Sequence, residues 1–458
     1  MKGKTSRTTG AFHGGGISMM DEKKKITRRK FLAQAAAATA GIAATGSLST
    51  VASWAAPLTS KQKIIFRQDL MPDLIMATLL SGFSKEHKGL SATSSYVNSD
   101  RGWEYDRART DRAPEWYTEG GSGDVFLARG PALAQLADEG TICPLDEFID
   151  SSSGLSRDDY HRSRYGSVLD SATYKEKLWG IPIYGNPYAL FCNIDLFSAA
   201  GIKNPPTTWE KTVEIARRCT RDTNGDGKPD VFGYSQCSFQ FPLEIFSSGL
   251  NVTDPVTGLS TFGSEDAVDA LDIYRRVHEY SPNHVNFEKG DMAMKISVTS
   301  NMFGLYKHIN YFIAPLPAGK RRANTYGDSG GIYALAISAR ATPECKAAAW
   351  KLIEYLTSES MFFKISAIDR ALPLRNSILK GERYSEYLKR YPLIKTFVDE
   401  LEYAVPKPCI PQYRFIEVVM REILLPVQTS KDPMALTRAQ LREHLLKQAE
   451  RVNEKLRS

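Results

Sequence analysis

The sequence predicts an α/β protein, because segments typical of strands alternate with segments typical of helices. Residues 63–66 predict a short strand, and residues 124–127, which follow a Gly-Ser-Gly turn, predict a buried one. Helical spacing follows each strand, over 74–83 and over 131–139, and the second of these helices ends at Gly140. Alternating strands and helices are typical of a sheet that is covered by helices.

The later elements carry their own start signals. The run Thr207-Thr208-Trp209-Glu210 fits a capping box, with Thr207 as the N-cap and Glu210 at the third helical position. Another helix is expected over 264–280. An apolar strand over 332–337 precedes Thr342-Pro343, which cap and open a helix that runs to Thr357. The last hundred residues predict helices interrupted by prolines.

The length of 458 residues predicts two or three domains and allows a sizeable core. Nine of the 59 basic residues lie in the first 55 positions, against two of the 52 acidic residues. The rest of the chain therefore carries fifty residues of each sign. A neutral body gives no electrostatic reason to expect nucleic acid or an anionic membrane as a partner.

Residues 1–55 predict a twin-arginine signal peptide. Lys23–Lys25 form a basic region, Arg28-Arg29 follow, and no charged residue occurs from Phe31 to Ser60. Ser53-Trp54-Ala55 is a small-x-small cleavage site. The alternative is an uncleaved anchor, and Met19 and Met20 offer alternative starts for the chain. We expect a periplasmic protein, or an extracellular one if the source lacks an outer membrane.

Familiar catalytic motifs are absent from the sequence. It contains no Gly-x-Ser-x-Gly, Walker loop, His-Glu-x-x-His or dinucleotide fingerprint. Six cysteines are scattered without a Cys-x-x-Cys pair, which favours buried free thiols over disulfides. These observations favour a protein that is not an enzyme.

A specific motif begins at Leu178. Leu178-Trp179-Gly180-Ile181-Pro182 is followed by Asn193-Ile194-Asp195-Leu196-Phe197, by Gly201 and by Pro205-Pro206-Thr207-Thr208-Trp209-Glu210. Weaker blocks are Gly123-Asp124-Val125, 290–294, 312–317, 330–338, Pro373-Leu374-Arg375 and Pro411-Gln412-Tyr413. In this order the blocks resemble the family 1 extracellular solute-binding proteins, which are the receptors of ABC importers. The resemblance runs from about residue 62 to about residue 450.

The resemblance implies a two-lobe periplasmic binding protein fold with an interlobe ligand cleft. The N-terminal lobe would comprise 62–180 and 302–370, and the C-terminal lobe 181–301 and 371–458. Hinge strands would cross between the lobes near 181–186, 298–301 and 370–374. The lobes of such proteins close around their ligand.

The resemblance also implies which residues face the cleft. Sugars present hydroxyl groups and weakly apolar ring faces, so a sugar site needs planar polar groups and aromatic rings. The implied residues are Gln68, Asp69, Arg129, Tyr184, Asn186, Tyr188, Gln236, Ser238, Phe239, Asp328, Ser329, Gly330, Tyr413 and Arg414. The alternative for each aromatic ring is ordinary packing, and for Asp69 and Asp328 a turn or a helix cap. A family tryptophan after residue 297 is missing here, or its place is taken by Phe303.

An acidic loop predicts a structural calcium ion. Asp222, Asn224 and Asp226 occupy positions 1, 3 and 5 of an EF-hand pattern, with the Lys228 carbonyl at position 7 and Asp230 at position 9. Position 12 is a glycine, so the usual bidentate glutamate is absent. The alternative is a turn held by its own side-chain hydrogen bonds.

Together these features predict a monomeric receptor that captures a carbohydrate and delivers it to the membrane subunits of an ABC importer. Apart from calcium, no cofactor is expected. One alternative is the same role for a phosphorylated polyol or another anionic solute, with Arg129 and Arg414 as clamps. A second alternative, from a different class, is an exported glycoside hydrolase.

Overall fold

The computed structural model describes residues 61–69, 73–96, 123–236, 240–281, 287–304, 306, 308–327, 331–369 and 371–458. All of these residues belong to one unit, Val51–Ser458. The signal peptide expected over 1–55 lies outside the described residues. So do five candidate site residues, namely Ser238, Phe239, Asp328, Ser329 and Gly330.

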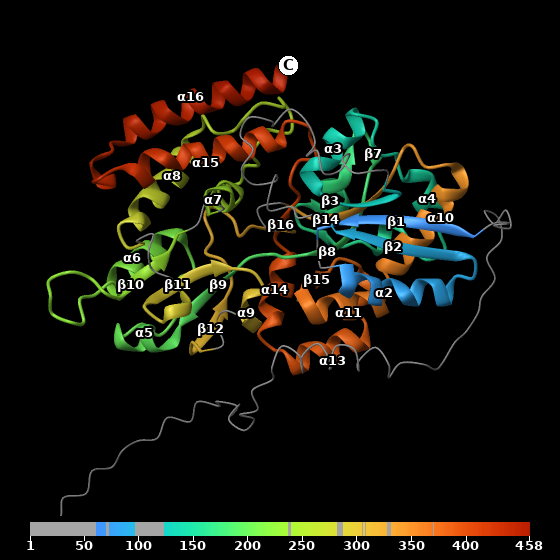
Figure 1. Ribbon diagram of the computed structural model, residues 1–458. Coiled ribbons are helices and arrows are strands. Elements are labelled where there is room, and N and C mark those ends of the chain that lie inside the picture. Colours follow the sequence, from blue (N-terminus) through green and yellow to red (C-terminus); the bar gives the residue numbers. More distant parts are fainter. Residues whose placement is uncertain are drawn as a thin grey trace, which may run out of the picture. The chain divides into compact units, whose positions relative to one another are not determined.

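The first sheet has six strands (Figure 1). They are β1 (Gln62–Gln68), β2 (Leu90–Tyr96), β3 (Val125–Arg129), β8 (Ile181–Gly185), β14 (Tyr333–Ile337) and β15 (Leu372–Pro373), in the order β15-β8-β14-β3-β1-β2. Strand β1 runs parallel to β2 and β3, whereas β14 runs antiparallel to β3 and β8. The ends of β3 and β8 and the start of β14 therefore meet at one edge of the sheet.

Helices bury the apolar side chains of this sheet. The covering helices include α2 (Asp73–Glu86), α3 (Gly130–Asp138) and α10 (Pro343–Leu356), whose apolar residues share one core with β1, β3 and β14. The predicted start of α10 is confirmed, because the Thr342 hydroxyl accepts the Cys345 amide at 3.3 Å and Pro343 opens the helix.

The second sheet has four strands and contributes residues to the first core as well as to a second one. They are β9 (Ala189–Asn193), β10 (Phe232–Ser235), β11 (Met292–Ser297) and β12 (Tyr311–Ala314), in the order β10-β11-β9-β12. Strand β9 is buried along its whole length. The core beside it is completed by α6 (Trp209–Cys219), α7 (Gln240–Ser248), α8 (Glu265–His278), α15 (Tyr413–Thr429) and α16 (Arg438–Arg457).

The N-cap of α6 is Thr208, so the prediction of Thr207 was wrong by one residue. The Thr208 hydroxyl accepts the Lys211 amide at 3.2 Å. Thr207 is held instead by a long-range contact, in which its carbonyl accepts the Ala318 amide at 3.0 Å. The sequence alone gives no sign of that contact.

Short segments link the two sheets. Residues 186–188 join β8 to β9, and a small parallel pair joins β13 (Asn324–Thr325) to β16 (Ala404–Val405). The buried Asn324 side chain makes two hydrogen bonds to the segment 186–188. Its Oδ1 accepts the Tyr188 amide at 3.0 Å, and its Nδ2 donates to the Tyr188 carbonyl at 2.7 Å.

The chain passes from one sheet to the other at positions that differ from the expected lobe boundaries. The sequence placed 302–370 in the N-terminal lobe, but β12 pairs with β9 in the second sheet. It placed 181–301 in the C-terminal lobe, but β8 pairs within the first sheet. Those bounds were implied by the family resemblance, and short strands such as β8, β9 and β12 carry no local signal of which sheet they join.

The remaining elements are short connectors or surface helices. The helices are α4 (Asp146–Ser151), α5 (Ile194–Ala199), α9 (Asn301–Gly304), α11 (Glu359–Asp369), α12 (Asn376–Leu379), α13 (Glu382–Arg390) and α14 (Ile394–Leu401). The short strands are β4 (Arg162–Ser163), β5 (Gly166–Ser167), β6 (Thr173–Tyr174) and β7 (Lys177–Leu178). The five cysteines in the described part of the chain carry free thiols, and three of them are buried.

Candidate functional site

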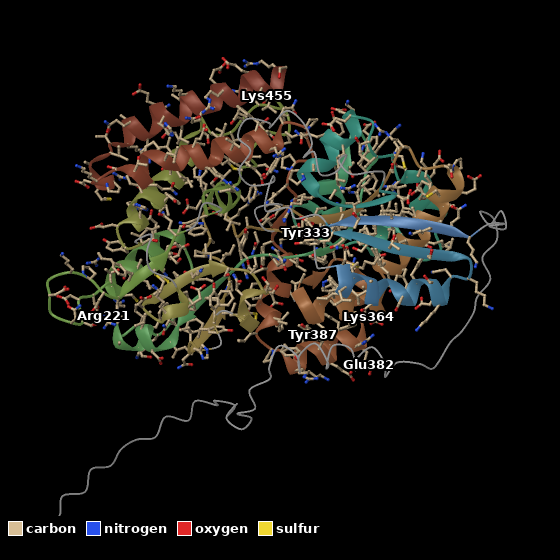
Figure 2. All side chains as sticks on the ribbon, in the orientation of Figure 1. Arg221, Tyr333, Lys364, Glu382, Tyr387 and Lys455 are labelled. Atoms are coloured by element: carbon tan, nitrogen blue, oxygen red, sulfur yellow. The ribbon has the colours of Figure 1, made fainter. Side chains whose placement is uncertain are left out.

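A cluster of polar and aromatic side chains lies at the edge where the strands of the first sheet end. Arg129 ends β3, and its guanidinium lies 4.6 Å from the centre of the Tyr333 ring at the start of β14. Figure 2 marks Tyr333 at this edge. The Tyr184 ring of β8 lies 5.1 Å from the Tyr333 ring. Asp69, just after β1, lies 3.8 Å from Arg129. The fold therefore brings together Asp69, Arg129 and Tyr184, three of the residues expected in the cleft.

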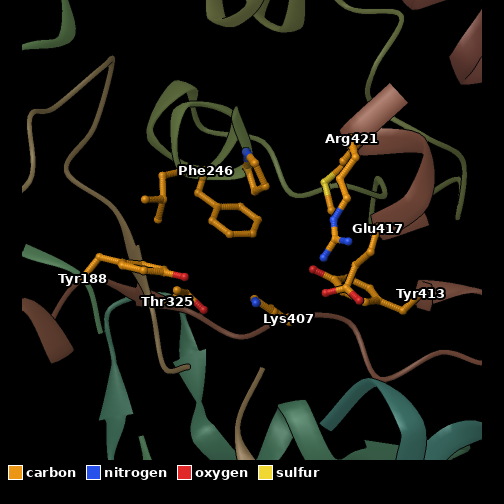
Figure 3. A pocket seen from close by; sticks show the side chains of 10 residues that line it. Tyr188, Phe246, Thr325, Lys407, Tyr413, Glu417 and Arg421 are labelled. Carbon is orange, nitrogen blue, oxygen red and sulfur yellow. The ribbon is translucent and has the colours of Figure 1, made fainter. Parts of the chain in front are cut away.

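A cavity lies where α7 and α15 meet the segments that link the sheets (Figure 3). Its lining residues are Tyr188, Pro242, Leu243, Phe246, Thr325, Lys407, Tyr413, Glu417, Met420 and Arg421. The cavity volume is about 40 Å³, which is room for a few water molecules. Sites that hold drug-sized ligands are larger, from about 300 Å³ upward. A sugar can therefore enter only if the walls move apart.

The walls of the cavity combine aromatic rings with charged groups. Tyr188, Phe246 and Tyr413 are each at most 3% exposed, so their rings give the cavity apolar surfaces. Lys407, Arg421 and Glu417 supply the charge. Figure 3 shows the Arg421 guanidinium directed toward Glu417. Burial raises the pKa of the Tyr413 hydroxyl well above its usual value, so it stays a neutral hydrogen-bonding group at pH 7.

The Glu417 carboxyl links the cavity to the edge of the first sheet. Burial raises its pKa to about 7, although Lys407, Arg421, Arg129 and Arg414 each act to lower it. Two of these cations, Arg129 and Arg414, were expected in the cleft. The cations that act on this one carboxyl therefore include Arg129 at the end of β3 and Arg414 at the start of α15.

The two other expected residues on the first link are also buried at this junction. Asn186 is 5% exposed and accepts a hydrogen bond from the Thr299 hydroxyl at 3.1 Å. The backbone N–H of Asn186 donates to the Tyr326 carbonyl at 3.1 Å. Tyr188 lines the cavity. Asn186 thus ties the link to the end of β11 rather than facing open solvent.

Two expected residues point elsewhere. The Gln236 amide nitrogen donates to the Tyr274 carbonyl at 2.7 Å, and its oxygen lies 2.5 Å from His278 Nδ1, both on α8. Gln68 is fully buried, and its amide donates to Ser94 on β2 at 3.0 Å. Neither side chain lines the cavity in this structure.

Sequence reasoning missed several cavity residues, and one signal could have found some of them. Tyr413, Glu417 and Arg421 recur every four residues along α15 and therefore share one face of that helix. Once Tyr413 was expected in the cleft, this spacing pointed to the other two. Phe246, Thr325 and Lys407 carry no such signal, because each comes from a different segment.

The acidic loop is closed by its own hydrogen bonds. The Asp222 carboxylate accepts the amides of Gly225 at 2.6 Å and Gly227 at 2.8 Å, and these bonds lower its pKa. Asp226 accepts the Lys228 amide at 2.8 Å. Figure 2 marks Arg221 where this loop begins. Within the described ranges no three His, Cys, Asp or Glu side chains are grouped so that they could hold a metal ion. Calcium at this loop stays a prediction.

No described helix combines the length and the apolarity needed to cross a membrane.

Comparisons with known proteins place the chain in a family. A model of the bacterial extracellular solute-binding protein family matches residues 83–361, which is more than half of the chain. A putative binding protein of Brucella abortus (strain 2308) is 24% identical over 290 residues. That match covers 58% of this chain and 66% of the relative, just under two thirds of its length.

Two solved structures share the fold. One is an ABC transporter solute-binding protein from Thermotoga lettingae TMO bound with alpha-D-tagatose, with a TM-score of 0.66 and 23% identity over 86% of this chain and 98% of that one. The other is the sugar-binding protein MalE from Xanthomonas citri, with a TM-score of 0.69 and 21% identity over the same shares. The predicted two-lobe α/β fold is confirmed. The chain belongs to the bacterial extracellular solute-binding protein family.

Proposed function

We propose that this chain is an extracytoplasmic receptor that captures a carbohydrate and delivers it to the membrane subunits of an ABC importer. The observation that carries the proposal is the cavity beside the linking segments. Tyr188, Phe246 and Tyr413 offer ring faces on which a sugar can stack, and charged and hydroxyl groups beside them can bind its hydroxyls. A site of this composition suits a polar ring better than an apolar ligand.

The small volume of the cavity supports a mechanism of opening and closing. At about 40 Å³ the cavity is too small for a sugar ring, so the ligand enters when the lobes separate. A ligand that contacts walls on both sides then stabilises the closed form. A difference of a few kcal/mol between the two forms is enough for such a shift.

The proposal is tested by a thermal-shift screen of sugars, followed by titration calorimetry on the hits. A ligand at 100 times its Kd should stabilise the protein by about 2.7 kcal/mol. Small-angle scattering should show a smaller radius of gyration at saturation. An unchanged radius would contradict the closure mechanism, whereas the absence of any stabilising sugar would contradict the carbohydrate receptor.

The export route is part of the proposal. Arg28-Arg29 and the cleavage site Ser53-Trp54-Ala55 support twin-arginine export and a mature monomer that begins near Ala56. Mass spectrometry of exported protein gives the mature N-terminus directly. A mature chain that retains Phe31–Leu48 would contradict cleavage.

The rival functions have their own signatures. A glycoside hydrolase would release product from a bound oligosaccharide, which chromatography of the incubated mixture would detect. A receptor for a phosphorylated polyol or another anion is favoured by one observation, the four cations that act on Glu417.

A further inference from the structure

Two of the three aromatic rings that line the cavity are attached by hydrogen bonds of their backbone to one segment outside it. This segment, residues 321–324, directly precedes Thr325, which lines the cavity. Figure 3 shows the Phe246 and Tyr188 rings among the side chains of the lining. The segment 321–324 itself does not line the cavity.

Arg321 caps the C-terminal end of α7, the helix that carries Phe246. Its backbone N–H donates to the Ser247 carbonyl at 2.8 Å, and its Nε donates to the Phe246 carbonyl at 2.8 Å. Carbonyl groups in the last turn of a helix have no partner within the helix, and a cation beside them is stabilising. The two bonds therefore fix the last turn of α7, and with it the backbone that carries the Phe246 ring.

The Arg321 side chain is itself held by a neighbouring ring. Its guanidinium lies 4.1 Å from the centre of the Tyr165 ring, in the turn between β4 and β5. The Tyr165 hydroxyl donates to the Arg322 carbonyl at 2.7 Å, so this ring is tied to the same segment. A cation–π contact and a hydrogen bond leave the guanidinium few alternative positions. Arg321 is therefore a rigid support for α7.

Asn324 holds the backbone of Tyr188 in the way that a neighbouring strand would. Its Oδ1 accepts the Tyr188 N–H at 3.0 Å, and its Nδ2 donates to the Tyr188 carbonyl at 2.7 Å. The Nδ2 also donates to Glu400 at 2.6 Å, and the Oδ1 also accepts the Thr325 N–H at 2.9 Å. The amide thus uses both of its donors and both of its acceptor positions, so turning it over would break all four bonds. The backbone from which the Tyr188 ring projects is therefore fixed.

We infer that Arg321 and Asn324 are positioning residues, which set the places of the Phe246 and Tyr188 rings and thereby the affinity for a sugar that stacks on them. The inference deepens the proposed receptor function and rests on it. A ring that already lies in its bound position loses little conformational freedom when a sugar packs against it. Without its support, each ring would have to be ordered during binding, which lowers the affinity.

The test follows each ring separately by fluorine NMR of the full chain without any sugar. One sample carries 3-fluorotyrosine at position 188 and another carries 4-fluorophenylalanine at position 246, so each spectrum has one protein signal. Arg321→Met should shift the signal from position 246 by more than its linewidth and leave that from position 188 in place. Asn324→Ala should do the reverse. A general loss of stability would not confine the change to one ring.

The matched control is Lys320→Met, which removes the neighbouring cation. Lys320 is exposed and pairs with Asp266 on α8, so neither signal should change. Arg321→Lys keeps a donor and a cation and should move the signal from position 246 less than Arg321→Met does.

Two results would overturn the placement of the rings by these residues. One is an unchanged signal from position 246 in Arg321→Met or from position 188 in folded Asn324→Ala. The other is a variant that changes both signals equally. If Asn324→Ala does not fold, Arg321→Met decides the inference, because it keeps the backbone bond to Ser247.

Titration calorimetry connects the placement of the rings to binding. The probes are glucose, galactose, maltose and cellobiose, which offer the hydroxyls and ring faces of one or two hexose units. A probe that binds the wild type should bind Arg321→Met about tenfold more weakly and Lys320→Met equally well. Equal affinities in Arg321→Met and the wild type would overturn the role of Arg321 in binding. If no sugar stabilises the wild type, the receptor function fails, whereas the fluorine signals still show whether these residues place the rings.

Discussion

Asp222 and Glu417 are two carboxyls whose surroundings shift their pKa values in opposite directions. In the exposed loop, amides of Gly225 and Gly227 donate to Asp222 and lower its pKa. In the cavity, burial raises the pKa of Glu417 to about 7 despite four nearby cations. Loss of water around Glu417 thus outweighs the attraction of its cations. Polar groups in an exposed loop are governed by their local hydrogen bonds, whereas those at the junction of the sheets are governed by burial and by charges from distant segments.

The largest effect on folding stability is expected at Asn324, which is fully buried between the two sheets. Its Nδ2 donates to Glu400 at 2.6 Å as well as to Tyr188, and Glu400 is fully buried beside Arg322. Asn324→Ala leaves the buried Tyr188 backbone groups without this partner and removes one hydrogen bond from Glu400, which keeps Arg322, and should lower the free energy of unfolding by about 3–5 kcal/mol. Urea unfolding measures this. The control Asn310→Ala, at an exposed asparagine, should cost far less. A loss under about 1 kcal/mol at Asn324 would contradict the account.

The second effect is the pH dependence that Glu417 imposes. Its pKa is raised from 4.5 unfolded to about 7 folded, so the folded state binds more protons between these values. The contribution to stability is complete below pH 4.5 and is lost as the pH rises through 7. By pH 8 to 9 the loss is on the order of 3 kcal/mol.

Glu417→Gln should remove this part of the pH profile. Urea unfolding between pH 5 and pH 9 on both proteins measures the difference. Parallel profiles for the wild type and the variant would show that the Glu417 carboxyl does not titrate in this range.

A smaller effect on stability is expected at Asn186, which is also buried at the junction of the sheets. Its side chain accepts one hydrogen bond, from Thr299, and both residues are buried. Asn186→Ala should cost about 1 kcal/mol of folding stability. A double-mutant cycle with Thr299→Val isolates the pair. An interaction energy of zero would show that the hydrogen bond between Asn186 and Thr299 does not contribute to stability.

The smallest effect is expected at Asp222. Its lowered pKa means that its contribution is present above pH 3.8 and is lost as the pH falls through the folded pKa. Since the loop is exposed, Asp222→Ala should hardly change the melting temperature at pH 7 without calcium. Calcium should raise the melting temperature of the wild type and not that of Asp222→Ala. If titration of the wild type with calcium gives neither binding heat nor a change in melting temperature, the prediction of calcium at this loop is wrong.

Several local features were predictable because neighbouring residues produce them. Thr342-Pro343 opens α10 as expected, since a cap and a proline act within one turn. Thr207 was expected to cap α6, but Thr208 is the cap, and the Thr207 carbonyl instead accepts the amide of the distant Ala318. The prediction failed where a long-range contact competed with a local signal.

The sequence by itself predicted the alternation of strands and helices, the family, and a set of cleft candidates that includes Tyr188, Arg129 and Arg414. It did so because periodicity, caps and short motifs act over a few residues. Only the tertiary structure decided that Lys407, Arg421 and Arg129 surround Glu417. The pKa of that carboxyl depends on the water excluded and the charges gathered by segments far apart in the chain. For that reason the sequence indicated a carbohydrate receptor, whereas the groups that act on Glu417 could be assigned only in the folded chain.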